Sequence, residues 1–523
     1  MAAHETGSRR IARAASVVMV GMALSSLTGL AATVLISGAF GTRFELDSFS
    51  AANRLTEILF NLMAGGALAS AFVPTFTGFL ARDDRFGAWR LASSIGNLIL
   101  IVLGSTALLA GLFAPALVQY VLAPGFKDPA QIQLTVQLLR VMLISPVIFA
   151  LSGLLMGILN AQQHFALPAL APACYRLGQI LGLVFLVPRW GILGLAWGVV
   201  LGSLLHLAVQ LPALLRYPLS YRVTLGLGDA ATRLVGALML PRLLGVAVVQ
   251  LNFLVNTILA SGMPEGSLAA ITLAFALMIM PQAVLAQSTG IAALPTFSAQ
   301  VARGELGAFR TAVADTLRAL VFLSLPASLG LMLLREPLVA LLLERGAFTA
   351  ESTTLVAWAL LWYAAGLVGH SLLEIAARAF YALQDTRTPV LIGAGAMALN
   401  VILSLTFASG FTRLGWMPHG GLALANSLAT ALECVVLLVL LAKRIGGLEG
   451  ARLRRGLLAS LGSGAAMAFG LWAWLQLSAG ASPWIVGTGG VVLGALVYFV
   501  AALALGAPEA RRVWTMVSGR GRG

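Results

Sequence analysis

The chain has 523 residues, of which 59% are hydrophobic and only 10% are charged, and its mean hydropathy is +0.94. Soluble domains carry about 25% charged residues, so a soluble fold of this length is excluded. The net charge of +14 does not indicate a nucleic-acid partner, and we expect none, because arginines in short loops orient membrane proteins. The composition predicts an all-α polytopic membrane protein.

Apolar runs long enough to cross a ~30 Å hydrocarbon core as helices recur along the whole chain. The run that follows Arg9, Arg10 and Arg13 is longer than the apolar core of a signal peptide, so we expect an uncleaved first span. We predict about fourteen transmembrane helices, near residues 13–38, 47–80, 92–117, 139–160, 167–187, 191–213, 236–260, 269–299, 315–334, 354–381, 389–409, 419–442, 457–477 and 484–506.

Basic residues concentrate in every second loop, which is typical of cytoplasmic loops. Arg82, Arg85 and Arg90 form one such group, whereas the loops between these groups hold isolated residues such as Lys127 and Arg189. With an even number of helices, this pattern predicts that both termini are cytoplasmic. The two cysteines, Cys174 and Cys434, lie in or beside apolar runs, and we expect neither a disulfide nor a metal site.

The sequence contains an internal repeat. "PTFTGFLARDDRFGAWR" from Pro74 resembles "PTFSAQVARGELGAFR" from Pro295. "MGILNAQQHFALP", ending at Pro168, and "ARAFYALQDTRTP", ending at Pro389, are separated by the same offset along the chain. We predict two parallel six-helix repeats plus a C-terminal helix pair, an arrangement found among transporters. The predicted parts are an N-terminal lobe (1–213), a cytoplasmic linker (214–235), a C-terminal lobe (236–442), and the helix pair with a basic cytoplasmic tail (443–523).

Several segments together resemble the MurJ/MviN lipid II flippases of the multidrug/oligosaccharidyl-lipid/polysaccharide exporter superfamily. They are "GGALASAFVPTF", "LAPGF", "LNAQQHFALPALAP", "GLAWGVVLGSLLHLAVQLP", "IAALPTFS", "RGAFT" and "FYALQDTRTPV". The resemblance implies a transporter of the bacterial inner membrane with fourteen helices in two lobes. It implies that alternating access carries the polyprenyl-pyrophosphate-linked peptidoglycan precursor from the inner to the outer leaflet.

The resemblance also implies an apolar groove for the polyprenyl tail along the last two helices. Small residues there permit close helix packing, namely Gly462, Gly464, Gly487, Gly489 and Gly490. We expect a polyprenyl-linked anionic lipid and membrane lipids as partners, and a monomer. No GxxxxGK[ST] loop is present, so we expect no use of ATP. We expect no enzyme activity and no cofactor, although Na⁺ or H⁺ coupling stays open.

The chain departs from the family in its charges. The family carries cavity arginines on its first, second and eighth helices. Here the first-helix stretch, residues 25–34, has no charge, the second-helix position falls at Phe60 or Asn61, and the eighth-helix position is Ala276. The acidic residue after the first helix is kept as Asp47. A pyrophosphate needs compensating charge in a low-dielectric site, so other residues must supply it, or the cargo differs, or the chain no longer transports.

Ionisable and amide side chains inside the spans are therefore the candidate site residues. The predicted substrate-binding residues are Arg54, Glu57, Asp47, Arg176, Asn252, Asn256 and Gln282, and the candidate for ion coupling is Glu433. Each has a structural alternative: Arg54 and Glu57 can neutralise each other at i, i+3, Arg176 can extend to the interface, and the amides can bond one another. Glu374 and Arg378 are predicted to pair at i, i+4.

Two other functions stay open on these residues. The first is export of a different lipid-linked glycan or of a small molecule, which the uncharged positions favour. The second is a non-transporting relative used in envelope assembly.

Overall fold

The structure is a computed structural model that describes residues 2–64, 67–217 and 220–517. These residues form helices joined by turns, with no strand among them. Eleven described helices are long and apolar enough to cross a bilayer, or thirteen if two bent pairs each count as one span. The predicted span 47–80 is described as two helices on either side of residues 65–66. The prediction of a polytopic helical membrane protein is confirmed.

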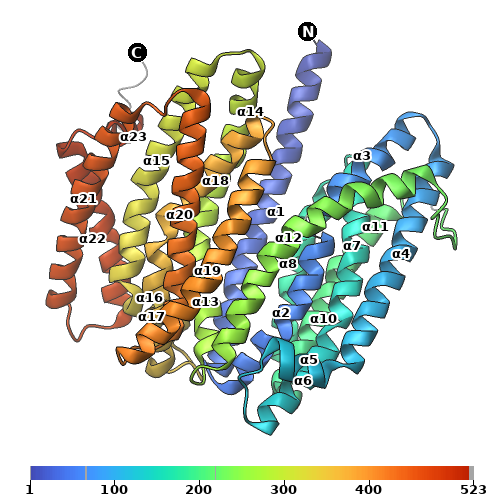
Figure 1. Ribbon diagram of the computed structural model, residues 1–523, viewed down its shortest axis with the longest axis horizontal. Coiled ribbons are helices and arrows are strands. Elements are labelled where there is room, and N and C mark those ends of the chain that lie inside the picture. The colour runs from blue at the N-terminus through green and yellow to red at the C-terminus, as the bar shows by residue number, and fades with distance from the viewer. Residues whose placement is uncertain (1, 65–66, 218–219, 518–523) are drawn as a thin grey trace. The chain divides into compact units, whose positions relative to one another are not determined.

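The chain forms two compact units, Met1–Leu268 and Ala269–Gly523. In the first unit, α2, α7 and α10 lie side by side (Figure 1). Its helices are α1 (Ala2–Phe40), α2 (Phe44–Ala64), α3 (Ala67–Ala81), α4 (Arg85–Leu112), α5 (Ala114–Leu117), α6 (Pro129–Met142), α7 (Ile144–Ala161), α8 (Ala166–Leu181), α9 (Val187–Trp190), α10 (Ile192–Ala208), α11 (Leu211–Leu214) and α12 (Ala230–Ser261). Two π-helical turns, Val118–Leu122 and Gly182–Leu186, follow α5 and α8.

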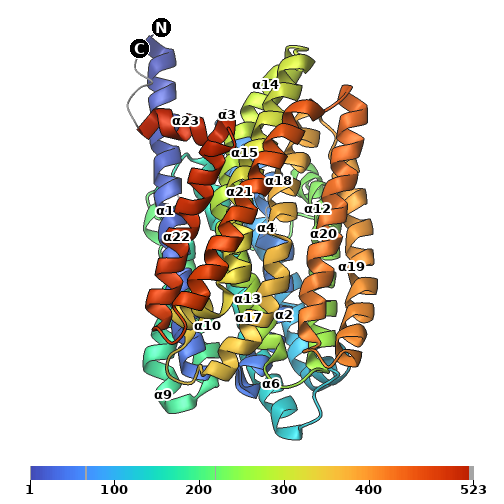
Figure 2. The same ribbon diagram turned by 90° about the vertical axis from the view of Figure 1, so that its left-hand side faces the viewer.

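The second unit continues from α13, whose first two residues precede the division. Its helices are α13 (Ser267–Gln282), α14 (Ser288–Ala302), α15 (Leu306–Leu333), α16 (Arg335–Leu343), α17 (Ala350–Ala365), α18 (Leu367–Ala382), α19 (Arg387–Arg413), α20 (His419–Ile445), α21 (Gly450–Leu477), α22 (Pro483–Ala504) and α23 (Pro508–Val517). A π-helical turn, Ala283–Gln287, joins α13 to α14. The helices α21 and α22 pack side by side, and α23 lies across one end of this pair (Figure 2).

The internal repeat is visible in the backbone. The helices α4 and α15 both have 28 residues, and their starts are separated by the same offset as the repeated sequence segments. The turns before them match as well, because Asp83 and Gly304, related by that offset, both have a left-handed backbone with φ of 56° and 72°. The matched Gln163 and Gln384 do the same, with φ of 59° and 58°. Left-handed backbone is uncommon for residues other than glycine, so the shared turns support the two parallel repeats.

The helix α12 packs with the first repeat, although the sequence repeat places it in the second. It contacts α2 and α3. At its C-terminal end, the Ser261 hydroxyl accepts a hydrogen bond from the Gly125 amide at 3.0 Å. A Cβ on Gly125 would lie 2.2 Å from the Gly262 nitrogen, so only glycine allows this approach. The boundaries at 213 and 236 stay a prediction about the duplication, while the packing divides the chain after Leu268.

Glycines hold α8 against α10. A Cβ on Gly178 would lie 2.2 Å from the Gly202 Cα, and a Cβ on Gly182 would lie 2.3 Å from the Gly198 Cα. Two glycines four residues apart on α10 thus face Gly178 of α8 and Gly182 of the π-helical turn that follows it, and the backbones come into direct contact, the usual means of close packing between membrane helices. This crossing fixes the position of α8, which carries Arg176.

Candidate functional site

In the first unit, Arg54 is held by groups from two helices. Its Nη1 donates to the Glu57 carboxylate at 2.8 Å, and its Nε donates to the Thr257 hydroxyl of α12 at 3.1 Å. Its guanidinium also lies 5.4 Å from the ring centre of Phe253. Glu57 accepts a second hydrogen bond from Asn53 at 2.7 Å. The Arg54 side chain is 15% exposed and that of Glu57 is 42% exposed, so the predicted pair exists and its carboxylate is the more open partner.

Phe60, one of the two residues at which the resemblance places the second-helix arginine, lies in an aromatic cluster. The Phe60 ring packs edge-on against Phe149, with the ring centres 4.6 Å apart. Phe149 in turn packs against Tyr175 of α8 at 4.8 Å. Phe60 is therefore fixed by apolar contacts, and this position contributes no charge.

Arg176 follows Tyr175 on α8 and lies against α1. Its Nη1 donates to the Gln179 side chain at 3.0 Å, and its guanidinium lies 5.4 Å from the Tyr175 ring centre. Its Nε is 3.6 Å from the point that a Cβ on Gly29 would occupy. Gly29 lies inside the uncharged stretch 25–34. A cation carried by α8 thus stands beside the segment of α1 where the resemblance predicts arginine.

Asp47 is buried at the beginning of α2, where it bonds the backbone. Its carboxylate accepts a hydrogen bond from the Gly266 amide at 2.7 Å. Nearby, the Glu265 carboxylate accepts one from the Phe44 amide at 2.9 Å. Both bonds fasten the turn after α12 to the start of α2. The structure gives Asp47 this positioning role, and its contact with substrate stays a prediction.

The predicted amides are divided between the two units. Asn252 and Asn256 are buried on α12, the same helix whose Phe253 and Thr257 contact Arg54. Gln282 is buried at the end of α13 in the second unit. Sequence reasoning missed Phe253 and Thr257 as partners of Arg54, because the contact joins two helices that lie far apart along the chain.

In the second unit, Glu374 and Arg378 form the predicted ion pair on α18. The guanidinium lies against α14, where a Cβ on Gly290 would come within 2.6 Å of the Arg378 Nε. By the offset of the repeat, the position in the first unit that matches Arg378 is Gly157 on α7. There a Cβ would lie 3.2 Å from the Phe72 ring of α3. At this matched position the first unit has a glycine packed against a phenylalanine, and the second unit has an arginine packed against a glycine.

Glu433 lies on α20 and is partly buried. One oxygen of its carboxylate is 3.1 Å from the point that a Cβ on Gly393 of α19 would occupy. The carboxylate therefore lies between two apolar helices, consistent with the choice of this residue as the candidate for ion coupling. Within the described residues, no group of three or more histidine, cysteine, aspartate or glutamate side chains is arranged to hold a metal ion.

The second unit also contains an apolar cavity of about 420 Å³. Apolar side chains of α13, α15, α16, α17, α21 and α22 and the glycine at position 330 line it, among them Met280, Leu331, Leu334, Met467 and Val491. The glycines predicted to permit close packing allow α21 and α22 to lie close to the helix that precedes α16 and lines this cavity. A Cβ on Gly490 would lie 2.7 Å from Leu334, and one on Gly464 would lie 3.0 Å from Leu329.

Comparisons of sequence identify the relatives of this chain. A family model described as "Lipid II flippase MurJ" matches residues 36–492. The lipid II flippase MurJ of Burkholderia cenocepacia is 32% identical over 428 residues, which cover 80% of this chain and 82% of that protein. The probable lipid II flippase MurJ of Bdellovibrio bacteriovorus is 30% identical over 515 residues and covers 97% of both chains.

Comparisons of structure agree in the fold. A lipid II flippase MurJ in an inward closed conformation matches with a TM-score of 0.79 at 23% identity, covering 93% of this chain and 97% of the other. An inward-facing multidrug transporter of the MATE family matches with a TM-score of 0.69 at 16% identity, covering 83% of this chain and 99% of the other. At these identities the likeness concerns the fold alone.

Proposed function

The chain belongs to the lipid II flippase MurJ family, and on that premise we propose that it moves lipid II, a polyprenyl-pyrophosphate-linked glycan, from the inner to the outer leaflet of the bacterial inner membrane. It acts as a transporter in peptidoglycan synthesis and catalyses no chemical step. Both termini lie in the cytoplasm, as the basic loops predict, and the chain works as a monomer.

The observation that carries this proposal is the contact of Arg176 with Gly29. Arg176 supplies a cation beside the stretch of α1 that lacks the arginines predicted by the resemblance. Arg54 supplies a second cation on α2, six residues before Phe60. Arginine suits a pyrophosphate because its planar guanidinium pairs two oxygens and stays charged when water is removed. We infer that Arg54 and Arg176 bind the pyrophosphate, with Glu57 releasing Arg54 when the substrate arrives.

We infer that the polyprenyl tail occupies the apolar cavity beside α21 and α22. Its walls are hydrocarbon, so an isoprenoid chain can pack there by van der Waals contact, as it does among lipid tails, while the headgroup crosses. The two six-helix repeats alternate access to the headgroup, as duplicated transporters do. Glu433 takes up a proton or Na⁺ and couples this motion to an ion gradient, without ATP.

Complementation tests the function. The protein is expressed in a bacterium depleted of its own lipid II flippase, alongside Arg54→Ala, Arg54→Lys and Arg176→Ala, with membrane levels compared by immunoblot. We expect rescue by the wild type, loss of rescue by the two alanine variants, and partial rescue by lysine. Arg189→Ala is the matched control, because Arg189 is an exposed arginine on α9, and it should rescue fully. Failure of the wild type at normal membrane levels would overturn lipid II as the cargo.

A second cargo is favoured by one specific observation. The second-helix position where the resemblance predicts an arginine is Phe60, which packs in an aromatic cluster, or Asn61, and neither is charged, so the site carries less positive charge than the family pattern. A lipid-linked glycan with a single phosphate would need less compensation. Flipping of such a lipid by reconstituted protein, together with failure to complement, would establish this alternative.

A further inference from the structure

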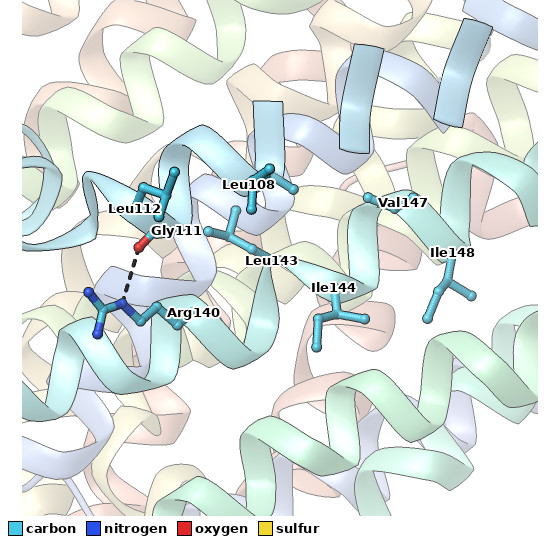
Figure 3. A pocket seen from close by; sticks show the side chains of 9 residues that line it. Leu108, Gly111, Leu112, Arg140, Leu143, Ile144, Val147 and Ile148 are labelled. Carbon is cyan, nitrogen blue, oxygen red and sulfur yellow. Dashed lines mark hydrogen bonds between the residues drawn. The ribbon is translucent and has the colours of Figure 1, made fainter. Parts of the chain in front are cut away.

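The first unit has a groove on its surface at the C-terminal end of α4. It has a volume of about 500 Å³ and lies between α4 and the consecutive helices α6 and α7 (Figure 3). Its lining is apolar apart from one guanidinium and consists of Ala107, Leu108, Gly111, Leu112, Arg140, Leu143, Ile144, Val147 and Ile148. None of these residues belongs to the site described above.

Arg140 lies at one end of the groove, and a single hydrogen bond holds its side chain. Its Nε donates to the Gly111 carbonyl at 3.1 Å, the contact drawn in Figure 3. Gly111 is the penultimate residue of α4, so its carbonyl has no partner within the helix. The bond orients the guanidinium and leaves Nη1 and Nη2 as donors. Within the described residues neither nitrogen has a hydrogen-bond partner, and the side chain is exposed.

The groove lies at the membrane interface opposite the basic loop before α4. This helix has 28 residues from Arg85 to Leu112, and at ~1.5 Å per residue it is roughly 42 Å long. That length matches a bilayer of about 40–45 Å including its headgroup regions. The flanks face lipid, because Leu108 and Leu112 are each 64% exposed and Ile144 is 43% exposed. Arg140 therefore sits at headgroup level, with hydrocarbon-lined space beside it.

We propose that this groove binds one anionic glycerophospholipid from the leaflet opposite the basic Arg85 end. The phosphate accepts hydrogen bonds from Nη1 and Nη2 of Arg140, and one acyl chain lies along Leu143, Ile144 and Val147. Charge complementarity selects the occupant. The only charged side chain lining the groove is a cation, and a guanidinium pairs well with a phosphate. A zwitterionic lipid carries its own ammonium next to the phosphate and is held less tightly.

Photolabelling of the full-length protein tests the proposal independently of its transported cargo. The protein is placed in phosphatidylcholine nanodiscs that contain a small fraction of either phosphatidylglycerol or phosphatidylcholine with a diazirine in one acyl chain. After irradiation, mass spectrometry quantifies adducts on residues 107–112 and 140–148. We expect phosphatidylglycerol to label these peptides about fivefold more than phosphatidylcholine, the factor equivalent to the ~1 kcal/mol that one arginine near a bilayer surface contributes toward anionic lipid.

Two variants separate the headgroup from the chain. Arg140→Gln should lower labelling by phosphatidylglycerol to the phosphatidylcholine level, and Val147→Trp should fill the groove and lower labelling by both lipids. Arg345→Gln is the matched control, because Arg345 is also exposed and bonds helix-end carbonyls, those of Leu341 and Leu342, but does not line this groove. It should leave labelling unchanged.

Equal labelling of the wild type by the two lipids would overturn the proposal, and this comparison needs no variant to fold. Unchanged phosphatidylglycerol labelling in a folded Arg140→Gln protein would also overturn it. Arg140 would then serve only to cap α4.

Discussion

The guanidinium of Arg176 on α8 fills the space beside Gly29 on α1, with its Nε 3.6 Å from the point that a Cβ of this glycine would occupy. A charge that the resemblance predicts on one helix is thus delivered by its neighbour. The contact is possible because α8 is held by the glycine crossing with α10, and because position 29 has no side chain.

This relationship predicts that the charge can be moved back to α1. Arg176→Ala should lower lipid II flipping in proteoliposomes by roughly tenfold or more, as expected for the loss of a charge-assisted hydrogen bond. Adding Gly29→Arg to that variant should restore much of the activity, because the new guanidinium enters the space that Arg176 has left. Gly29→Leu in the same background is the uncharged control. Equal activity of the arginine and leucine double variants would contradict a role for charge.

The Arg54–Glu57 pair allows a test of function against structure. If the pair only neutralises itself, Arg54→Ala with Glu57→Ala should be as active as the wild type, since no unpaired charge is left. If Arg54 binds pyrophosphate, that double variant should stay inactive while Glu57→Gln keeps activity. Flipping rates of the wild type and these two variants, normalised to the amount of reconstituted protein, decide between the two roles of Arg54. Activity in the double alanine variant would remove Arg54 from the site.

The close crossing of α8 and α10 predicts that alanine substitutions at two glycines differ strongly in their effect on stability. A Cβ on Gly178 would lie 2.2 Å from the Gly202 Cα, so Gly178→Ala should force the backbones apart and destabilise the protein by about 1–3 kcal/mol. Gly104→Ala on α4 is the control, because no atom lies within 4 Å of its Cβ position. It should be neutral or stabilise by about 0.5–1 kcal/mol. Melting temperatures of both variants and the wild type in detergent show which substitution destabilises the protein.

Asp385, in the loop between α18 and α19, predicts that the stability of the protein depends on pH. Hydrogen bonds from the backbone and hydroxyl of Thr388, and the pairing with Arg444, lower the pKa of Asp385 to about 2. Because its pKa is lower in the folded state than in the unfolded chain, at about 3.9, its contribution to stability is complete above that value and is lost as the pH falls toward 2.

Asp385→Asn should therefore lower the melting temperature at pH 7, and the gap to the wild type should narrow as the pH falls from 5 to 2. Melting curves of the two proteins across this range measure the gap. A gap that stays constant or widens on acidification would show that the carboxylate charge does not stabilise this loop.

The proposed coupling role of Glu433 predicts how the flipping rate responds to an imposed ion gradient. Glu433→Gln removes the group that takes up the ion but keeps its size, so flipping should lose its acceleration by a proton or Na⁺ gradient while exchange without a gradient continues. Glu351→Gln, at an exposed position on α17, is the control. An unchanged gradient response would assign the coupling to another group.

Much of the fold could be predicted from the sequence because hydropathy and the repeat are local or periodic signals. The constant offset between the Pro74 and Pro295 segments reappears in the turns at Asp83 and Gly304. Side-chain partners could not be predicted in this way. Arg176 contacts a glycine of α1 that is distant in sequence. The one sequence feature that could have indicated this contact is the missing side chain at position 29. The packing of α12 against α2 and α3, and its turn contact with Gly125, join segments that the repeat does not relate.

The matched positions Gly157 and Arg378 have a consequence for the history of the chain. Since the duplication, the two halves have diverged here: a Cβ at position 157 would lie 3.2 Å from the Phe72 ring, whereas Arg378 fills the space beside Gly290. The two copies are therefore no longer interchangeable at this position. Arginine placed alone at position 157 would press against Phe72, so that exchange should destabilise the first half unless Phe72 is also replaced by alanine, the residue at the matching position 293.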